Sequence, residues 1–285
     1  MIKILNYFFQ SLFVYLFFLI GRILGLTISR KLFSHLFSLI GPIFKSKKII
    51  TNNLNIFSYK NSFIDEKKII NIMWKNYGMT FVEYVFLNHF RKQDSHLKIK
   101  NKQILLNIPQ EKKPVIFISG HFANFELMSM EITKNKVPLA TIYRPLNNIF
   151  LNPLMEFLRK KYVCQNQIKK GINGVRDCIK YIKNNYSIAL MIDQRVSEGE
   201  KINLFGKPAL TTTLPAQLSL KFALDIIPVY IERDQDNNFE IEFQNRIDPK
   251  NFKSKIDLTK ELNKVLEKMI VRNPNQWIWT HNRWK

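Results

Sequence analysis

Near its start the chain carries a long stretch without a single charge, and this stretch limits the folds that are open to it. Residues 4–21 (ILNYFFQSLFVYLFFLIG) are 18 consecutive positions without Asp, Glu, Lys or Arg. A helix needs about 20 apolar residues to cross the hydrocarbon core of a bilayer, so the stretch is close to the minimum for spanning. Its Tyr and Phe side chains also suit a helix that lies in the interface without crossing. A second apolar stretch, residues 32–44, contains His35 and is too short to span.

Basic residues lie mostly on the C-terminal side of the uncharged stretch. Lys3 alone precedes it, whereas the residues that follow include Arg22, Arg30, Lys31, Lys45, Lys47 and Lys48. Because positively charged flanks tend to stay in the cytoplasm, we expect the rest of the chain to be cytoplasmic. No small-x-small cleavage site of a signal peptide follows the stretch, while a buried core helix stays open as an alternative. We predict a membrane anchor with a basic flank in residues 1–48 and one catalytic domain in residues 49–285.

The chain is strongly basic. Its 44 Lys and Arg residues outnumber 22 Asp and Glu residues, which gives a formal net charge of +22. Such a charge favours anionic partners: nucleic acid, acidic lipid headgroups, phosphorylated substrates or acidic carrier proteins. The sequence contains no zinc-finger spacing of Cys and His, no RNP-like aromatic block and no basic region that leads into heptads. We therefore interpret the charge as support for binding to a membrane with anionic lipids, and we expect no nucleic acid partner.

The two cysteines, Cys164 and Cys178, lack the spacing of metal ligands, and one possible pair does not make a disulfide framework. Their number is typical of a protein in the reducing cytosol. A thiol can in principle carry an acyl group, but we interpret both as small buried apolar side chains. The sequence predicts no metal and no cofactor.

Along the rest of the chain, apolar runs typical of strands alternate with helical patterns. We expect strands at residues 98–106, 115–118, 139–143, 187–192, 226–232 and 239–243. We expect helices at residues 61–90 (two amphipathic segments), 150–162, 174–184, 214–224 and 258–271. The last two strands would form a hairpin around residues 236–238. This alternation predicts an α/β fold with a mixed central sheet flanked by helices.

A buried strand followed at once by a histidine, VIFISGHFANFE at residues 115–126, carries the strongest chemical signal. His121 stands at the carboxyl end of the strand, and Glu126 stands near the start of a helix. A carboxylate that orients an imidazole builds a general base. On one continuous helix the two side chains would be about 500° apart, so they meet only if His121 lies in the loop and Glu126 in the first turn. The alternative is a solvated loop histidine beside an ordinary helix-start glutamate.

Two further polar residues follow expected strands. Arg144 comes directly after residues 139–143, and Asp193 comes directly after residues 187–192. In an α/β sheet, functional residues gather at the carboxyl ends of the strands. We therefore expect His121, Arg144 and Asp193 to converge on one crevice.

Several blocks along the chain, taken in order, resemble one protein family. They are SGHFANFEL at residues 119–127, YRPLNN at 143–148, Arg159 on the following helix, MIDQ at 191–194, LFGKPALTTT at 204–213 and QWIWTHNRW at 276–284. The first block contains a His-x4-Asp/Glu motif. With these blocks the chain resembles the bacterial lipid A late acyltransferases, the lauroyl/myristoyl transferases of lipopolysaccharide synthesis. Ile149 departs from the pattern, because family members often carry proline there, and this would change only a helix start.

The resemblance implies an acyltransferase with a glycerolipid-acyltransferase-like fold, anchored in the bacterial inner membrane with its catalytic domain on the cytoplasmic side. It implies transfer of a fatty acyl chain from acyl carrier protein to a hydroxyl on a hydroxyacyl chain of a lipid A precursor of the Kdo-lipid A type. His121 would be the general base. Glu126 would hold one ring nitrogen and stabilise the imidazolium.

Five other residues are candidates for binding the substrates: Arg144, Arg159, Asp193, Thr211 and Thr212. The planar guanidinium of an arginine suits a phosphate or a sugar carboxylate. Asp193 would accept from an arginine or a sugar hydroxyl, or pair with a structural cation. The run of three threonines, residues 211–213, is a candidate for contacting the substrate, although helix capping explains Thr213 at least as well. His281 fits an aromatic and basic edge at the lipid headgroups, although a packed C-terminus explains its Trp neighbours equally well.

Two alternatives stay open. A glycerophospholipid acyltransferase uses the same His-acid chemistry, but such proteins usually carry a Phe-Pro-Glu-Gly-Thr-Arg-like block. Residues 197–200 (SEGE) keep only the Glu-Gly pair of that block. A basic protein that binds membrane surfaces without turnover belongs to a different class and would also explain the charge.

Overall fold

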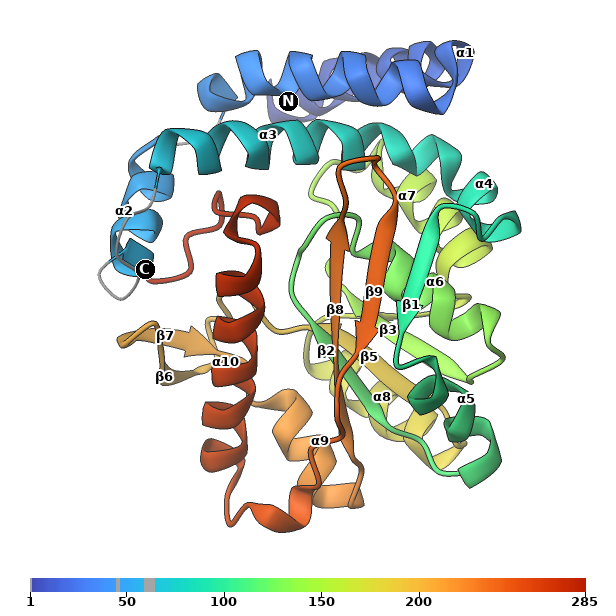
Figure 1. Ribbon diagram of the computed structural model, residues 1–285, viewed down its shortest axis with the longest axis vertical. Coiled ribbons are helices and arrows are strands. Elements are labelled where there is room, and N and C mark those ends of the chain that lie inside the picture. The colour runs from blue at the N-terminus through green and yellow to red at the C-terminus, as the bar shows by residue number, and fades with distance from the viewer. Residues whose placement is uncertain (1, 45–46, 59–64) are drawn as a thin grey trace.

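The computed structural model describes residues 2–44, 47–58 and 65–285 (Figure 1). A seven-stranded sheet has the order β1-β9-β8-β2-β5-β3-β4. Its strands are β1 (Leu97–Lys100), β2 (Ile116–Ser119), β3 (Leu139–Tyr143), β4 (Asn166–Lys169), β5 (Ser187–Met191), β8 (Ile226–Arg233) and β9 (Phe239–Phe243). Neighbouring strands pair in parallel except β8 and β9, which are antiparallel. The predicted mixed sheet flanked by helices is confirmed.

Helices lie on either side of this sheet (Figure 1). They include α5 (Lys102–Glu111), α6 (Glu126–Lys134), α7 (Asn152–Leu158), α8 (Ile172–Lys183), α9 (Leu214–Phe222) and α10 (Lys255–Arg272). Four of them, α7 to α10, lie where the sequence predicts helices. The prediction of a strand over residues 98–106 is wrong beyond Lys100. Asn101 takes a left-handed backbone conformation with φ 56°, which ends the strand, and α5 begins at the next residue.

The predicted pair of amphipathic helices before the sheet is also present. It consists of α3 (Glu66–Glu83) and α4 (Leu87–Lys92), joined by a 3₁₀ turn, Tyr84–Phe86. The carboxylate of Asp65 accepts from the Lys68 backbone N–H at 3.0 Å and so caps the start of α3. The prediction placed the start at residue 61, and residues 61–64 lie outside the described part of the chain.

The sequence pattern does not predict three short strands. Of these, β4 extends the sheet beside β3, while β6 (Glu200–Leu204) and β7 (Lys207–Thr211) form a separate antiparallel hairpin. Phe205 and Gly206 connect β6 to β7 with φ values of 53° and 76°. Two consecutive positive φ values are typical of the tight type I′ turn. These strands are short and largely polar, so no apolar alternation reveals them.

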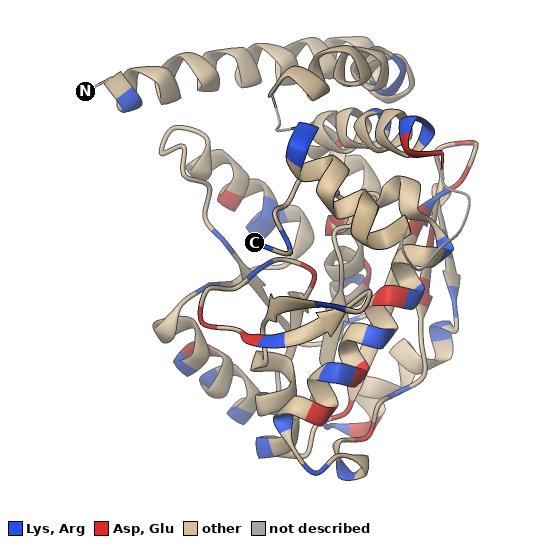
Figure 2. Ribbon diagram, turned by 90° about the vertical axis from the view of Figure 1, so that its left-hand side faces the viewer, with Lys and Arg blue, Asp and Glu red and all other residues tan. Residues whose placement is uncertain are grey.

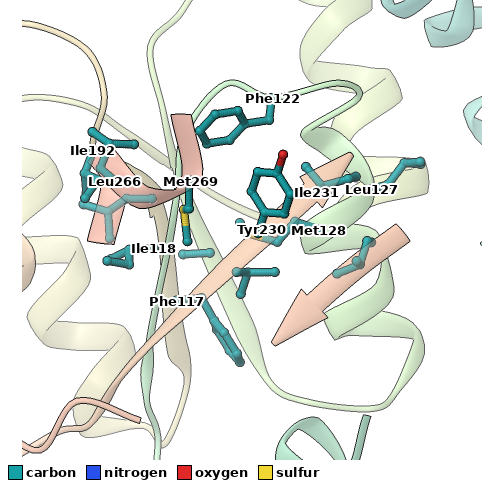
Figure 3. Packing of buried hydrophobic residues seen from close by; sticks show 14 of the residues in the cluster. Phe117, Ile118, Phe122, Leu127, Met128, Ile192, Tyr230, Ile231, Leu266 and Met269 are labelled. Carbon is teal, nitrogen blue, oxygen red and sulfur yellow. The ribbon is translucent and has the colours of Figure 1, made fainter. Parts of the chain in front are cut away.

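The apolar core lies between the sheet and the helices α6 and α10. In Figure 3, Phe117 and Ile118 of β2 lie close to side chains of β8, α6 and α10. All four residues of β2 are buried, as expected for a central parallel strand. Phe122, which follows β2, packs edge-on against Tyr230 of β8 with 5.3 Å between the ring centroids. This packing holds the loop after β2 against the sheet.

One long helix, α1 (Ile2–Phe44), contains both apolar stretches from the start of the chain. It bends at Gly25, where φ is 74° and ψ is 167°, a conformation that favours glycine. Across the bend, Ser29 Oγ donates to the Gly21 carbonyl at 2.7 Å. The arm after the bend lies along α3 (Figure 1), whereas the arm before the bend contacts α3 near the bend, where Phe18 packs against Phe81. A Cβ atom on Gly78 of α3 would lie 2.1 Å from the carbonyl oxygen of Phe33, so only glycine permits this close approach.

The exposed face of α1 is apolar. Large exposed residues on it include Ile2, Phe9, Phe13, Leu19, Ile23, Leu39 and Ile43. Figure 2 shows few charged residues along this helix, in contrast to the mixed charges over the body. By length and composition α1 is able to cross a membrane. A large exposed apolar surface marks a site of membrane or protein interaction, which is consistent with the predicted membrane association.

A buried ionic network joins α1 and α3 to the sheet. Glu83 of α3 is fully buried and accepts from Arg30 Nε of α1 at 2.7 Å. Arg233 of β8 donates to the two oxygens of the same carboxylate at 2.6 and 3.0 Å. Asn124, in the loop after β2, donates to it at 2.9 Å. Burial alone would raise the pKa of Glu83, but the two guanidinium groups outweigh burial and lower it.

Replacing Glu83 by Ala should lower the free energy of unfolding by about 3–5 kcal/mol, because the change leaves Arg30 and Arg233 buried without a carboxylate. Chemical denaturation of the protein in detergent, followed by circular dichroism, measures this loss. The matched control is Glu261→Ala, which breaks an exposed pair with Lys264 on α10. Exposed pairs contribute at most about 1 kcal/mol. Equal losses in the two variants would contradict a stabilising role of the network.

The contribution of Glu83 should also depend on pH. Its pKa is lower in the folded protein than in the unfolded chain, where about 4.3 is usual for glutamate. The stabilisation is therefore fully present above that unfolded value and is lost as the pH falls through the lower folded value. Accordingly, the difference in unfolding free energy between the wild type and Glu83→Ala should shrink in acid.

Candidate active site

His121 lies in the loop directly after β2, next to the carboxyl end of β5. These two strands are parallel neighbours, with Ser119 opposite Met191 in register. The Asp193 carboxylate accepts from the His121 backbone N–H through Oδ2 at 2.8 Å and contacts the ring Nδ1 through Oδ1 at 2.7 Å. The predicted convergence of His121 and Asp193 at neighbouring strand ends is confirmed.

Asp193 is buried and held in its ionised form. The indole N–H of Trp277 donates to Oδ2 at 2.9 Å. Burial alone would raise the pKa of Asp193, but His121 and Trp277 outweigh burial and lower it to about 2. An ionised carboxylate only accepts hydrogen bonds, so Nδ1 of the neutral His121 ring carries the proton and Nε2 carries the lone pair. Within the described residues Nε2 has no hydrogen-bond partner, which leaves it available as a base.

Glu126 has a different partner from the one predicted. It is the first residue of α6, so the predicted placement of His121 in the loop and Glu126 in the first turn is correct. No hydrogen bond joins these two described residues. Glu126 Oε1 instead accepts from Arg159 Nε at 2.8 Å and from the Tyr84 hydroxyl at 2.6 Å. Because Asp193 already holds His121 Nδ1, and Arg159 offers Glu126 a full positive charge, the predicted His121–Glu126 pair is wrong.

Arg159 is fixed on one side of the site. It begins a short π-helical turn, Arg159–Val163, directly after α7. Burial alone would lower the pKa of this guanidinium, but Glu126 and Tyr84 outweigh burial and raise it. Its Nη2 also donates to the Tyr84 hydroxyl at 3.1 Å. Arg159 therefore stays charged and holds one orientation.

A cavity of about 510 Å³ opens in front of His121. Its polar lining includes His121, Glu126, Arg144, Arg159, Lys170, Thr212 and His281. Its apolar lining includes Phe125, Met128, Ile142, Val163, Leu190 and Leu214. A concave cavity in which polar groups converge beside apolar walls is typical of a small-molecule site. The structure thus brings together most of the site residues predicted from the sequence.

Two residues predicted to bind substrate have other roles. Asp193 orients His121 and does not line the cavity. Thr211 is buried, and its hydroxyl donates to the Ala209 carbonyl at 3.0 Å and accepts from Arg283 Nη2 at 2.8 Å. These bonds occupy the hydroxyl, so the predicted substrate contact of Thr211 is wrong.

Thr212, in contrast, lines the cavity as predicted for a substrate-binding residue. Its hydroxyl also accepts from the Leu214 backbone N–H at 3.3 Å, at the first residue of α9. Thr213 is the N-cap residue of α9, as considered from the sequence, but its side chain makes no capping hydrogen bond, and the bond to the first backbone N–H comes from Thr212.

Four residues of the site were not predicted as site residues: Tyr84, Lys170, Trp277 and His281. The last two belong to the C-terminal block QWIWTHNRW, which was the available signal. Our interpretation of that block as an edge at the lipid headgroups is wrong, because Trp277 and Trp279 are buried. The alternative of a packed C-terminus is correct. Tyr84 has no comparable signal in the sequence.

Two further kinds of site depend on His, Cys, Asp and Glu side chains: a metal site and a nucleophilic thiol. Among the described residues, no group of three His, Cys, Asp or Glu side chains is placed to hold a metal ion. Cys164 and Cys178 are buried, and burial raises the pKa of their thiols to about 11 and about 12. A thiol that stays protonated near neutral pH is a poor nucleophile.

The fold and the site together define an α/β enzyme in which His121, bound to Asp193, lines a cavity with polar and apolar walls. The sequence profile of the family described as bacterial lipid A biosynthesis acyltransferase matches residues 1–285. The chain belongs to this family and is an acyltransferase of lipid A biosynthesis. The resemblance stated from the sequence blocks is thereby confirmed.

The fold is similar to the crystal structure of the 1-acyl-sn-glycerophosphate (LPA) acyltransferase PlsC from Thermotoga maritima, with 16% sequence identity and a TM-score of 0.43. The match covers 89% of this chain and 100% of that chain. No curated protein matches the sequence.

Proposed function

We propose that the protein transfers a fatty acyl chain from acyl carrier protein to a hydroxyl on a hydroxyacyl chain of a lipid A precursor of the Kdo-lipid A type. The observation that carries the proposal is the pair of His121 and Asp193. The 2.7 Å contact of Nδ1 with a buried carboxylate leaves Nε2 free beside the cavity. A neutral imidazole in this orientation suits removal of a hydroxyl proton near neutral pH.

The reaction requires no covalent acyl-enzyme, because a thioester is already activated. His121 Nε2 takes the proton of the acceptor hydroxyl while the hydroxyl oxygen forms a bond to the thioester carbonyl carbon. Asp193 stabilises the resulting imidazolium. The C–S bond then breaks, and the imidazolium gives its proton to the departing sulfur. The products are the new ester and the free carrier thiol, and His121 is neutral again.

Cations around the cavity support a phosphorylated acceptor. Arg144 and Lys170 both line it, and neither forms a salt bridge with any described carboxylate. Burial, and then the charge of Arg144, lower the pKa of Lys170, so the two cations are close enough to repel each other. A phosphate or sugar carboxylate near them would offset this repulsion. Arg159 adds a guanidinium held in place by Glu126, and Thr212 adds a hydroxyl.

The charge of the protein supports the proposed donor. Carrier proteins are acidic, and a chain with a net charge of +22 attracts them over long range. This attraction should weaken as salt is added. Coenzyme A thioesters are also polyanionic and are the alternative donor.

The apolar surface of α1 supports attachment to the inner membrane. We propose that residues 1–48 form the anchor and that residues 49–285 form the catalytic domain on the cytoplasmic side, as the distribution of basic residues favours. Protease added to inside-out membrane vesicles should then remove the catalytic domain, whereas right-side-out vesicles should protect it. The opposite pattern would reverse the orientation.

The acceptor is tested with two lipids side by side. In mixed micelles with an acyl carrier protein thioester, the protein should acylate a phosphorylated glucosamine disaccharide lipid in preference to lysophosphatidic acid. Mass spectrometry of the products measures both reactions. Arg144→Ala should raise KM for the disaccharide lipid more than it lowers kcat, because Arg144 is proposed to bind and not to react. Robust acylation of lysophosphatidic acid alone would favour the glycerophospholipid alternative and overturn the proposed acceptor.

A further inference from the structure

A second histidine, His281, lines the same cavity as His121. Its backbone carbonyl accepts from Asn53 Nδ2 of α2 (Lys47–Ser58) at 2.8 Å and from the Arg283 backbone N–H at 2.8 Å. Asn53 is fully buried, so this part of the C-terminal segment is held from the side of α2 as well as by its own turn. The position of His281 is therefore fixed, although the chemistry proposed for His121 and Asp193 does not involve this residue.

The hydrogen bonding of the His281 ring determines where its proton lies. Nε2 accepts from the Arg195 backbone N–H at 3.1 Å. A backbone N–H can only donate, so Nε2 presents its lone pair and the neutral ring carries its proton on Nδ1. Nδ1 has no hydrogen-bond partner among the described residues. Burial lowers the pKa of His281, so the ring is neutral near neutral pH.

The two imidazoles therefore present opposite groups. Both carry the proton on Nδ1. His121 turns Nδ1 to Asp193 and leaves the lone pair of Nε2 free, whereas His281 turns Nε2 to Arg195 and leaves the N–H of Nδ1 free. A cavity lined by a free base and a free neutral donor has both groups that attack on a carbonyl requires.

We propose that His281 donates a hydrogen bond from Nδ1 to the carbonyl oxygen of the donor thioester. This inference rests on the proposed acyl transfer and adds a second catalytic residue to it. When the acceptor oxygen bonds to the carbonyl carbon, the carbonyl π electrons move onto oxygen, and the N–H stabilises the negative charge that develops. When the C–S bond breaks, those electrons re-form the carbonyl. His281 neither gains nor loses a proton in either step.

The test compares variants at position 281. His281→Phe keeps an aromatic ring but removes the N–H, and kcat should fall by about 10²–10³-fold, as for other donors to an oxyanion. KM and the unfolding temperature should stay close to those of the wild type. His281→Gln retains an N–H donor and should recover part of kcat. His35→Phe, at an exposed histidine of α1, is the matched control and should leave kcat unchanged.

The pH dependence separates a donor from a base. Because His281 exchanges no proton, His281→Phe should lower the rate at every pH without moving the inflection of the pH–rate profile. Selective ¹⁵N-histidine labelling should show the His281 ring protonated on Nδ1. The inference would be overturned if the inflection moved or if the spectra placed the proton on Nε2. It would also be overturned if His281→Phe changed only KM or the unfolding temperature and left kcat unchanged. A wild type that acylates only lysophosphatidic acid would refute the proposed acceptor, yet the comparison would still decide the role of His281, because His281 acts on the donor.

Discussion

Asparagine in place of Asp193 should lower kcat by about 10⁴-fold in a protein that stays folded. The reason is the arrangement of donors around the carboxylate. Oδ2 accepts from the His121 backbone N–H and from the Trp277 indole N–H, so the carbonyl oxygen of the new Asn side chain must lie there. Its NH₂ group then faces Nδ1 of His121. Nδ1 must accept, the ring proton moves to Nε2, and the lone pair that acts as the base is lost.

Steady-state kinetics on the purified protein measure this effect, and Glu126→Gln is the matched control. The glutamine oxygen can still accept from Arg159 and Tyr84, so the tautomer of His121 should not change. Asp193→Asn alone should convert the His121 ring to the form protonated on Nε2, which ¹⁵N spectra of labelled histidine detect. An Asp193→Asn protein with kcat near that of the wild type would contradict the assigned pairing.

Alanine in place of His121 should lower kcat by about 10²–10⁴-fold, the usual effect of losing a general base. The fold should survive, because the ring lies at the cavity, where it contacts Asp193 and packs against Phe125 with 4.6 Å between the ring centroids. Kinetics and thermal unfolding of the same preparation measure both properties. Free imidazole added to the assay should restore part of the rate, because the vacated space is open to the cavity. A well-folded His121→Ala protein with near-normal turnover would exclude His121 as the base.

The position of the site was predictable because it depends on local pattern. A buried apolar run followed by a polar residue predicts the carboxyl end of a strand, and parallel strands align those ends. His121, Arg144 and Asp193 were placed at one edge of the sheet on this basis. The structure has β2, β5 and β3 side by side, in agreement with that prediction.

The partners of the charged residues were not predictable in the same way. Asp193 is 72 positions from His121, and Arg159 is 33 positions from Glu126. No local spacing indicates which of the two carboxylates reaches the imidazole. That choice depends on tertiary packing, because the buried Trp277 and the backbone N–H of His121 fix the Asp193 side chain. The five-residue spacing of His121 and Glu126 therefore predicted the wrong pair.

Two features of the fold were not predicted from the sequence, for different reasons. The bend of α1 depends on the backbone of Gly25, and a glycine within an apolar helical stretch does not by itself predict a bend. The β6–β7 hairpin consists of two five-residue strands with only two buried residues each, so its apolar alternation is too short to reveal a half-buried strand.

The central claim is that this protein acylates lipid A through the pair of His121 and Asp193. Its most direct test is mass spectrometry of lipid A from a bacterial host that lacks its own late acyltransferases. Expression of the wild type should add one acyl chain to the lipid A of this host. His121→Ala and Asp193→Asn, present in the membrane at matched levels, should add none. The claim would be contradicted if the wild type left lipid A unchanged. It would also be contradicted if the two variants acylated lipid A as well as the wild type does.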